Sequence, residues 1–156
     1  MSLDRNRGNG RDFGNDRDLG RIRPDTGDGD AIARTWMLIV GVALVAAGLL
    51  GFIDNPIVSG RDDALFMVDT THNVIHIVTG LAALLIGATL RGRTLAQATI
   101  AFGVAYLLVL VATLVSPDLF GILSMPVNAA DHVLHLVLSA GSIAAGLASQ
   151  RDRATA

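Results

Sequence analysis

Four long apolar stretches divide this sequence, and they constrain its fold more than any other feature. Aspartate and arginine are absent from residues 35–53, 74–90, 94–117 and 133–150. Each stretch is close to the ~20 residues that a helix needs to cross the hydrocarbon core of a bilayer. None has the polar stripe at helical spacing that a helix of a soluble bundle would show. The stretches therefore predict an all-α integral membrane protein, a four-helix bundle that crosses the membrane four times.

Turn residues and charges set the expected ends of these helices. The first helix should stop at Asp54-Asn55-Pro56, because the residue before a proline disfavours helical geometry. The polar segment before residue 34 has too few apolar side chains to offset the entropy of ordering, so we expect it to be disordered. The expected helices span residues 33–53, 70–90, 95–115 and 128–149, and the expected domains are a polar tail (1–33), a transmembrane domain (34–150) and a C-terminal tail (151–156).

The distribution of arginine predicts the orientation in the membrane. All twelve basic residues are arginine, and they lie before the first helix, between the second and third, and after the fourth, except for Arg61. Positive residues stay on the cytoplasmic side, so we expect both termini in the cytoplasm and the protein in the inner (plasma) membrane. The net charge of −2 gives no argument for a nucleic-acid partner. We expect the lipid bilayer as the partner, and leave a homo-oligomer or a second membrane protein open.

All four histidines lie in two similar polar clusters, each at the start of an apolar stretch. The first cluster, DTTHNVIH, begins at Asp69, and the second, NAADHVLH, begins at Asn128. The sequence Gly-Val-Ala also recurs, at residues 41–43 and 103–105. These repeats predict that the bundle consists of two pseudo-equivalent helical hairpins.

Helix capping explains part of each cluster. Asp69 and Asn128 are preferred N-cap residues at positions where a helix begins and its backbone N–H groups lack partners. Asp131 follows Asn128 by three residues, the position from which an acid reaches back to the cap. We expect these three residues to act as caps.

The histidines need a further explanation, because polar side chains inside a membrane are costly and face the bundle interior. His76 and His135 each follow their cap by seven residues, which places them at equal depth. We expect them to meet between the second and fourth helices, flanked by Asn73 and Asp131. The predicted polar network comprises Asp69, His72, Asn73, His76, Asn128, Asp131, His132 and His135, with His72 and His132 nearer to the water.

Three interpretations of the histidines are open. The preferred one is an interhelical hydrogen-bond network, at about 1 kcal/mol for each bond, which fixes the pairing of the helices. The second is a transition-metal site for Zn, Cu or Fe. The third is haem held by His76 and His135, beside which the small residues Gly80 and Ser139 leave room for a flat ligand. The candidate metal ligands are His72, His76, Asp131 and His135.

A catalytic function lacks residues to carry it. The sequence shows no nucleophile with an adjacent base, no phosphate-binding glycine loop and no carboxylate pair, and it has no cysteine. We therefore expect a non-enzymatic structural or accessory membrane protein without a cofactor. The alternative is a haem- or metal-binding redox or sensor protein that uses His76 and His135.

Four motifs resemble a family of small bacterial four-helix membrane proteins that is catalogued as a domain of unknown function. They are DNP at 54–56, HNVIHIVTG at 72–80, LFG at 119–121 and NAADHVLHL at 128–136. The resemblance covers about residues 35–150 and implies the fold and the membrane location, with no established activity. That family often has asparagine at the position of His132, so the resemblance implies no ligand role for this histidine.

Overall fold

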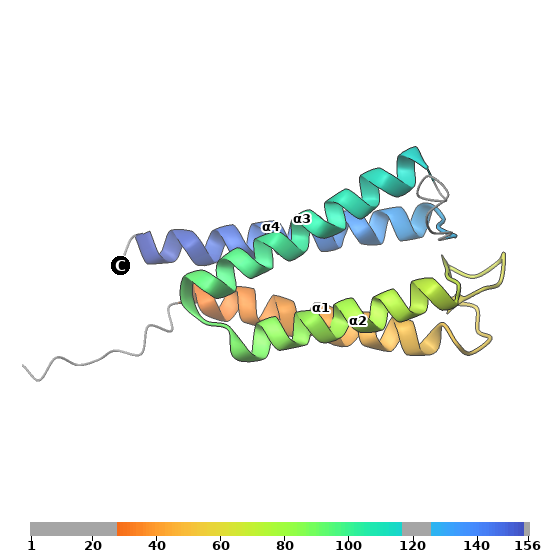
Figure 1. Cartoon of the computed structure of the whole chain (residues 1–156), viewed down its shortest axis with the longest axis horizontal. Helices are drawn as coiled ribbons and strands as arrows, with labels where there is room; N and C mark the ends of the chain where they lie inside the picture. The colour runs from red at the N-terminus through yellow and green to blue at the C-terminus, as the bar shows by residue number, and fades with distance from the viewer. Residues whose placement is uncertain (1–27, 117–125, 155–156) are drawn as a thin grey trace, which may run out of the picture.

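The computed structural model (Figure 1) describes residues 28–116 and 126–154, and within these the chain forms four helices. They lie lengthwise against one another, with α1 beside α2 and α3 beside α4. The all-α four-helix architecture predicted from the sequence is confirmed. The helices are α1 (Asp28–Leu50), α2 (Thr70–Thr89), α3 (Gly92–Val115) and α4 (Ala129–Ala154).

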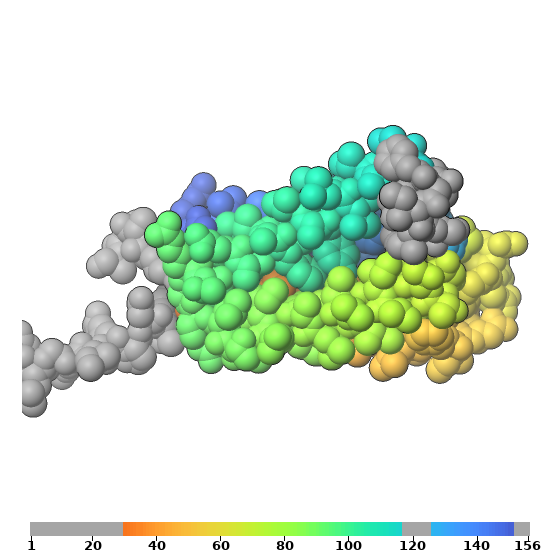
Figure 2. Space-filling model, in the orientation of Figure 1, coloured from red at the N-terminus to blue at the C-terminus, as the bar shows by residue number. Residues whose placement is uncertain are grey.

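The surfaces of the helices suit a bilayer. Each helix is long and apolar enough to cross a membrane. Large apolar side chains point outward along the bundle, and those of Leu85 and Leu108 are 63% and 65% exposed. Figure 2 shows the face that α2 and α3 form together. Such a surface would be unfavourable in water and matches the acyl chains of lipids, so the chain is a multi-pass membrane protein.

The polar start of α1 differs from the prediction. The sequence predicts a start near residue 33, but the helix begins at Asp28. Asp30 is buried, and its carboxylate accepts hydrogen bonds from the Gly92 backbone N–H at 2.8 Å and the Ser149 hydroxyl at 3.3 Å. These contacts with α3 and α4 stabilise the extra turn, and a hydrophobicity pattern does not reveal them. Residues 28–33, which the sequence placed in the disordered tail, therefore belong to α1. The rest of the predicted tail lies outside the described residues.

The end of α4 also differs from the prediction. The helix continues to Ala154, whereas the sequence predicts an end near residue 149 and a separate tail from residue 151. Helix ends are the least certain part of any sequence pattern, because polar residues such as Arg151 are as acceptable in a last helical turn as in a tail.

Close backbone contact holds each hairpin together. A Cβ atom at Gly80 would lie 2.8 Å from the Val45 backbone nitrogen and 2.9 Å from the Gly41 carbonyl oxygen. In the second hairpin, a Cβ atom at Gly103 would lie 2.8 Å from the Ser139 carbonyl oxygen. Small residues therefore let the paired helices approach closely, as expected for helices that pack in lipid. The space beside Gly80, which the sequence suggested was open to a flat ligand, is filled by the backbone of α1.

A short parallel pair of strands orders the connection between α1 and α2. β1 (Val58–Ser59) pairs with β2 (Phe66–Met67), which the sequence pattern does not predict. The Asn128 carboxamide donates a hydrogen bond to the Leu65 carbonyl at 3.0 Å. The Asp131 carboxylate accepts one from the backbone N–H of the last residue of β2 at 3.2 Å. The connection of the first hairpin is thus tied to the start of α4, beside the histidine-bearing turns.

Candidate functional site

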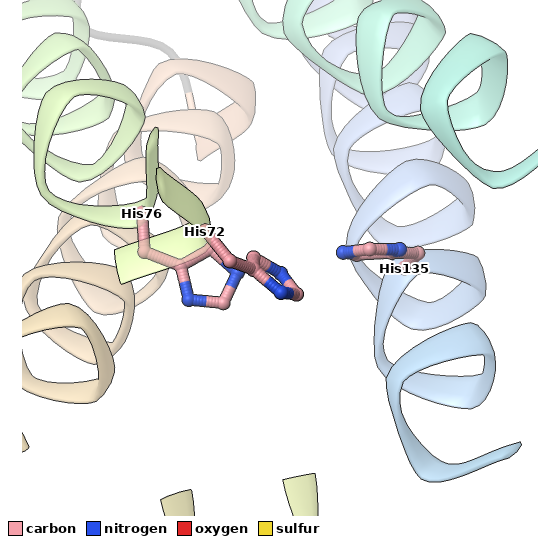
Figure 3. A group of neighbouring side chains, drawn as sticks. All are labelled: His72, His76 and His135. Carbon is pink, nitrogen blue, oxygen red and sulfur yellow. The ribbon is translucent and has the colours of Figure 1, made fainter. Parts of the chain in front are cut away.

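Three histidine side chains meet inside the bundle, near the end at which α2 and α4 begin (Figure 3). His72 and His76 come from α2 and His135 comes from α4, and each is at most 3% exposed. One ring nitrogen from each residue can be chosen so that all three lie within 4.8 Å of one another. We call His72, His76 and His135 the histidine group. Because it draws on both hairpins, anything bound to it would link the two halves of the bundle.

The start of α2 is fixed by Asp69. Its carboxylate accepts a hydrogen bond from the His72 backbone N–H at 2.7 Å, which caps the helix. His72 and His76 are four residues apart, so they project from the same face of α2. Their ring centroids lie 4.4 Å apart. The cap therefore sets the position of both α2 histidines relative to the end of the bundle.

A reciprocal capping box begins α4. Asn128 Oδ1 accepts hydrogen bonds from the backbone N–H groups of Ala130 at 2.9 Å and Asp131 at 3.1 Å. The Asp131 carboxylate in turn accepts one from the Asn128 backbone N–H at 2.8 Å. Such a box satisfies donors at both positions and fixes the first turn. His135 follows about two turns further along the helix.

The ring nitrogens of the histidine group are poorly satisfied. Among the described residues, no hydrogen-bond partner lies near Nδ1 of His72, Nδ1 of His135 or either ring nitrogen of His76. The Pro126 backbone carbonyl lies near the His72 ring. An unpaired buried polar atom costs about 1–3 kcal/mol. The predicted interhelical network thus has no bond between these rings within the part of the chain that the structure describes.

Tyr106 of α3 covers the histidine group from the second hairpin. Its ring centroid lies 5.8 Å from that of His135, and its hydroxyl is 2.8 Å from the hydroxyl of Thr79 on α2. Sequence reasoning missed this interhelical contact. The available signal was that this is the one tyrosine of the chain and that it lies in the middle of an apolar stretch.

The other predicted site residues lie around the histidine group without joining it. Asp131 is buried, but its carboxylate is bound to backbone N–H groups of the cap and of β2. Asn73 is buried, and its carboxamide lies against Gly51 at the end of α1. His132 is only partly buried, whereas His72, expected nearer to the water, is 1% exposed. The predicted four-residue ligand set therefore reduces to the histidine group.

The arrangement does not fit a haem held by His76 and His135. In Figure 3 the His72 ring lies between the other two, with its centroid 4.4 Å from His76 and 6.1 Å from His135. A porphyrin would need that space. A cavity of about 190 Å³ does adjoin His76, but its other lining residues are apolar and come from α1, α4 and the strands β1 and β2. A single metal ion needs only the point on which the ring nitrogens converge.

The comparisons with known proteins extend over most of the bundle. A family model with the description "Domain of unknown function (DUF4383)" matches residues 34–148. This range includes both histidine clusters and the LFG motif at 119–121, which lies outside the described residues. No curated protein and no solved structure matches the chain.

Proposed function

The chain belongs to the DUF4383 family, a domain of unknown function, and from the histidine group we propose that it binds one transition-metal ion inside the membrane. One observation carries the proposal. Three buried imidazoles from two helices bring ligand nitrogens within 4.8 Å of one another, and buried nitrogens on all three rings lack partners among the described residues. Such a cluster is costly when empty, and a metal ion would use the nitrogen lone pairs that the protein leaves free.

The distances support this proposal. Metal–nitrogen bonds of ~2.0–2.1 Å in tetrahedral geometry place the ligand nitrogens ~3.4 Å apart. The observed spread of up to 4.8 Å closes by small rotations of the rings, because the second side-chain torsion of histidine is soft. The position of the Pro126 carbonyl near the His72 ring supports it further, since metal-bound histidines usually donate their other ring N–H to a carbonyl or carboxylate.

The chemistry of the ligands limits the metal. Imidazole nitrogen suits Zn²⁺, copper, iron and nickel, whereas Mg²⁺ and Ca²⁺ need oxygen ligands. Three protein ligands leave a fourth position for water or a small molecule, whereas structural zinc sites are filled by four protein ligands. Catalytic zinc sites also keep such an open position, but the sequence shows no nucleophile with an adjacent base and no carboxylate pair. We therefore propose metal binding or sensing without an enzymatic step. A purely structural role for the three histidines, by contrast, would rest on hydrogen bonds between their rings.

We also propose the orientation that the arginines indicate. With both termini in the cytoplasm, the end of the bundle at which α2 ends and α3 begins, with Arg91 and Arg93, lies on the cytoplasmic side. The histidine group lies near the opposite end of α2, so it would face the extracytoplasmic side of the inner (plasma) membrane. In that position it would take its metal from outside the cytoplasm.

Metal titration of the purified protein tests the proposed function. The full chain in detergent, stripped with a chelator, should take up one Zn²⁺ or Co²⁺ per chain, measured by elemental analysis after gel filtration. Because the ion binds only the folded state, a free concentration of 100 times Kd should stabilise the bundle by ~2.7 kcal/mol. Uptake far below one ion per chain for zinc, cobalt, copper, iron and nickel would overturn the proposal.

A further inference from the structure

A polar recess lies at the end of the bundle at which α2 begins. Its volume is about 470 Å³, and part of its lining comes from the connection between α1 and α2. The recess is more polar than the cavity beside His76, because carboxylates, a hydroxyl and a carboxamide line it. The residues that matter here are Asp62, Asp69, Thr70, Asn73 and Pro126.

Three lining residues connect the recess directly to the histidine group. Asp69 accepts a hydrogen bond from the His72 backbone N–H at 2.7 Å. The backbone carbonyl of Pro126 lies near the His72 ring. Asn73 is the next residue along α2. The residues that line the recess therefore also surround His72, so the recess adjoins the histidine group.

The oxygen atoms of the recess suit a hydrated cation. Asp62 and Asp69 contribute carboxylates. Asn73 is 2% exposed, and its Oδ1 has no hydrogen-bond partner among the residues described. Carboxylate and carboxamide oxygens suit transition-metal ions less well than imidazole does, so they would hold such an ion more weakly than the histidine group. Weak binding is what a transit site requires, because the ion must leave again for the imidazoles.

Asp63, the neighbour of Asp62, forms an ion pair with Arg61. Its carboxylate binds the Arg61 guanidinium at 2.8 Å. These hydrogen bonds hold the pKa of Asp63 below its usual value. Because Arg61 offsets the charge of Asp63, the negative charges at the recess come from Asp62 and from Asp69, the cap of α2.

We infer that this recess is the loading site through which a hydrated divalent metal cation reaches the histidine group from the extracytoplasmic side. The inference rests on the proposed function, because the route serves that metal site. A carboxylate near the entrance raises the association rate of a cation by electrostatic attraction, and salt screens the effect. It leaves the strength of the final imidazole bonds unchanged.

Binding kinetics of Co²⁺ to the full chain in detergent test the route. Removing one charge about 10 Å from a divalent ion in water slows loading about fourfold. Asp62→Asn should show this change at ~10 mM salt and lose it near 1 M, where the Debye length is ~3 Å. The equilibrium Kd for Co²⁺ should stay that of the wild type. Gln97→Arg changes the net charge equally at the exposed start of α3, at the opposite end of the bundle, and should load like the wild type.

A second variant separates the effect of charge from a local rearrangement that Asp62→Asn could cause in the connection between α1 and α2. Thr70→Lys adds a positive charge at an exposed position that lines the recess, and it should slow loading by a similar factor. Loading of Asp62→Asn and Thr70→Lys at the wild-type rate, with normal final binding, would overturn the route and leave the metal site standing. Equal slowing by Gln97→Arg, or a weaker Kd at an unchanged rate, would overturn it too. Failure of the wild-type chain to bind any of zinc, cobalt, copper, iron and nickel would overturn both proposals.

Discussion

Replacing His135 with alanine should weaken metal binding by more than about 100-fold. His135 is the ligand that α4 contributes to the histidine group. Loss of a residue that merely orients a metal ligand already costs 10- to 100-fold in affinity, so loss of a ligand itself costs at least as much. The Kd for Zn²⁺, measured by competition with a chelator of known affinity, gives the result. His76→Ala and His72→Ala should show losses of the same order.

The fourth histidine supplies the matched control. His132 lies on the same helix, three residues before His135, but outside the histidine group. His132→Ala should keep the Kd within a few-fold of the wild type. If His132→Ala and His135→Ala weakened binding equally, the ion would be held by some other set of residues. If all four alanine variants bound like the wild type, histidine would have no part in the binding.

Replacing Gly80 with leucine should destabilise the folded bundle by about 3 kcal/mol. Even the first atom of a side chain at this position would lie 2.8 Å from Val45 N and 2.9 Å from Gly41 O. These are backbone atoms, so relieving the contact requires a shift of α1 itself. Overpacking of a close contact typically costs 1–3 kcal/mol, and leucine adds three further carbons. Unfolding by a denaturing detergent, followed by circular dichroism, measures the change in free energy.

A substitution on the lipid-facing side of α2 controls for the larger and more apolar side chain that Gly80→Leu introduces. Ala82 is two residues further along the same helix, and it is exposed. Ala82→Leu should change the free energy of unfolding by less than about 0.5 kcal/mol. Equal stability of Gly80→Leu and Ala82→Leu would contradict the close packing of α1 on α2. Gly80 lies one turn after His76, so Gly80→Leu should also displace that ligand and weaken metal binding.

The helices and their caps are the features that the sequence predicts best. Apolar length alone indicates the number of helices, because each stretch must satisfy its own backbone hydrogen bonds in lipid. Asp69 and the pair Asn128 and Asp131 lie where residue type and spacing favour a cap, and their side chains bond to the backbone N–H groups of those first turns. Such local signals depend on neighbours within one turn, which a sequence displays directly.

The features that the sequence does not predict depend on contacts between distant segments. α1 begins at Asp28 because Asp30 bonds to Gly92 and Ser149, which lie 62 and 119 residues away. The histidine group is similar in this respect. Spacing of four residues places His72 beside His76. Only the packing of both α2 and α4 against α1 brings these two side chains to His135, because α2 and α4 make no close backbone contact with each other over their described lengths.

The same packing favours the metal site that we propose among the three interpretations of the histidines. The close approach of α1 at Gly80 and the position of the His72 ring remove the space for a haem. The ring nitrogens then converge without bonding to one another in the described part of the chain. A sequence motif specifies which side chains are available, and the distances between helices decide what those side chains can hold.

X-ray absorption spectroscopy of the zinc-loaded protein tests the central claim most directly, because it reports the atoms bound to the metal. We expect three imidazole nitrogens and one light atom at ~2.0–2.1 Å, with the outer-shell scattering that imidazole rings produce. The imidazole contribution should be lost or reduced in His135→Ala. A first shell of oxygen alone, with no imidazole scattering in the wild-type protein, would contradict a metal site made by His72, His76 and His135.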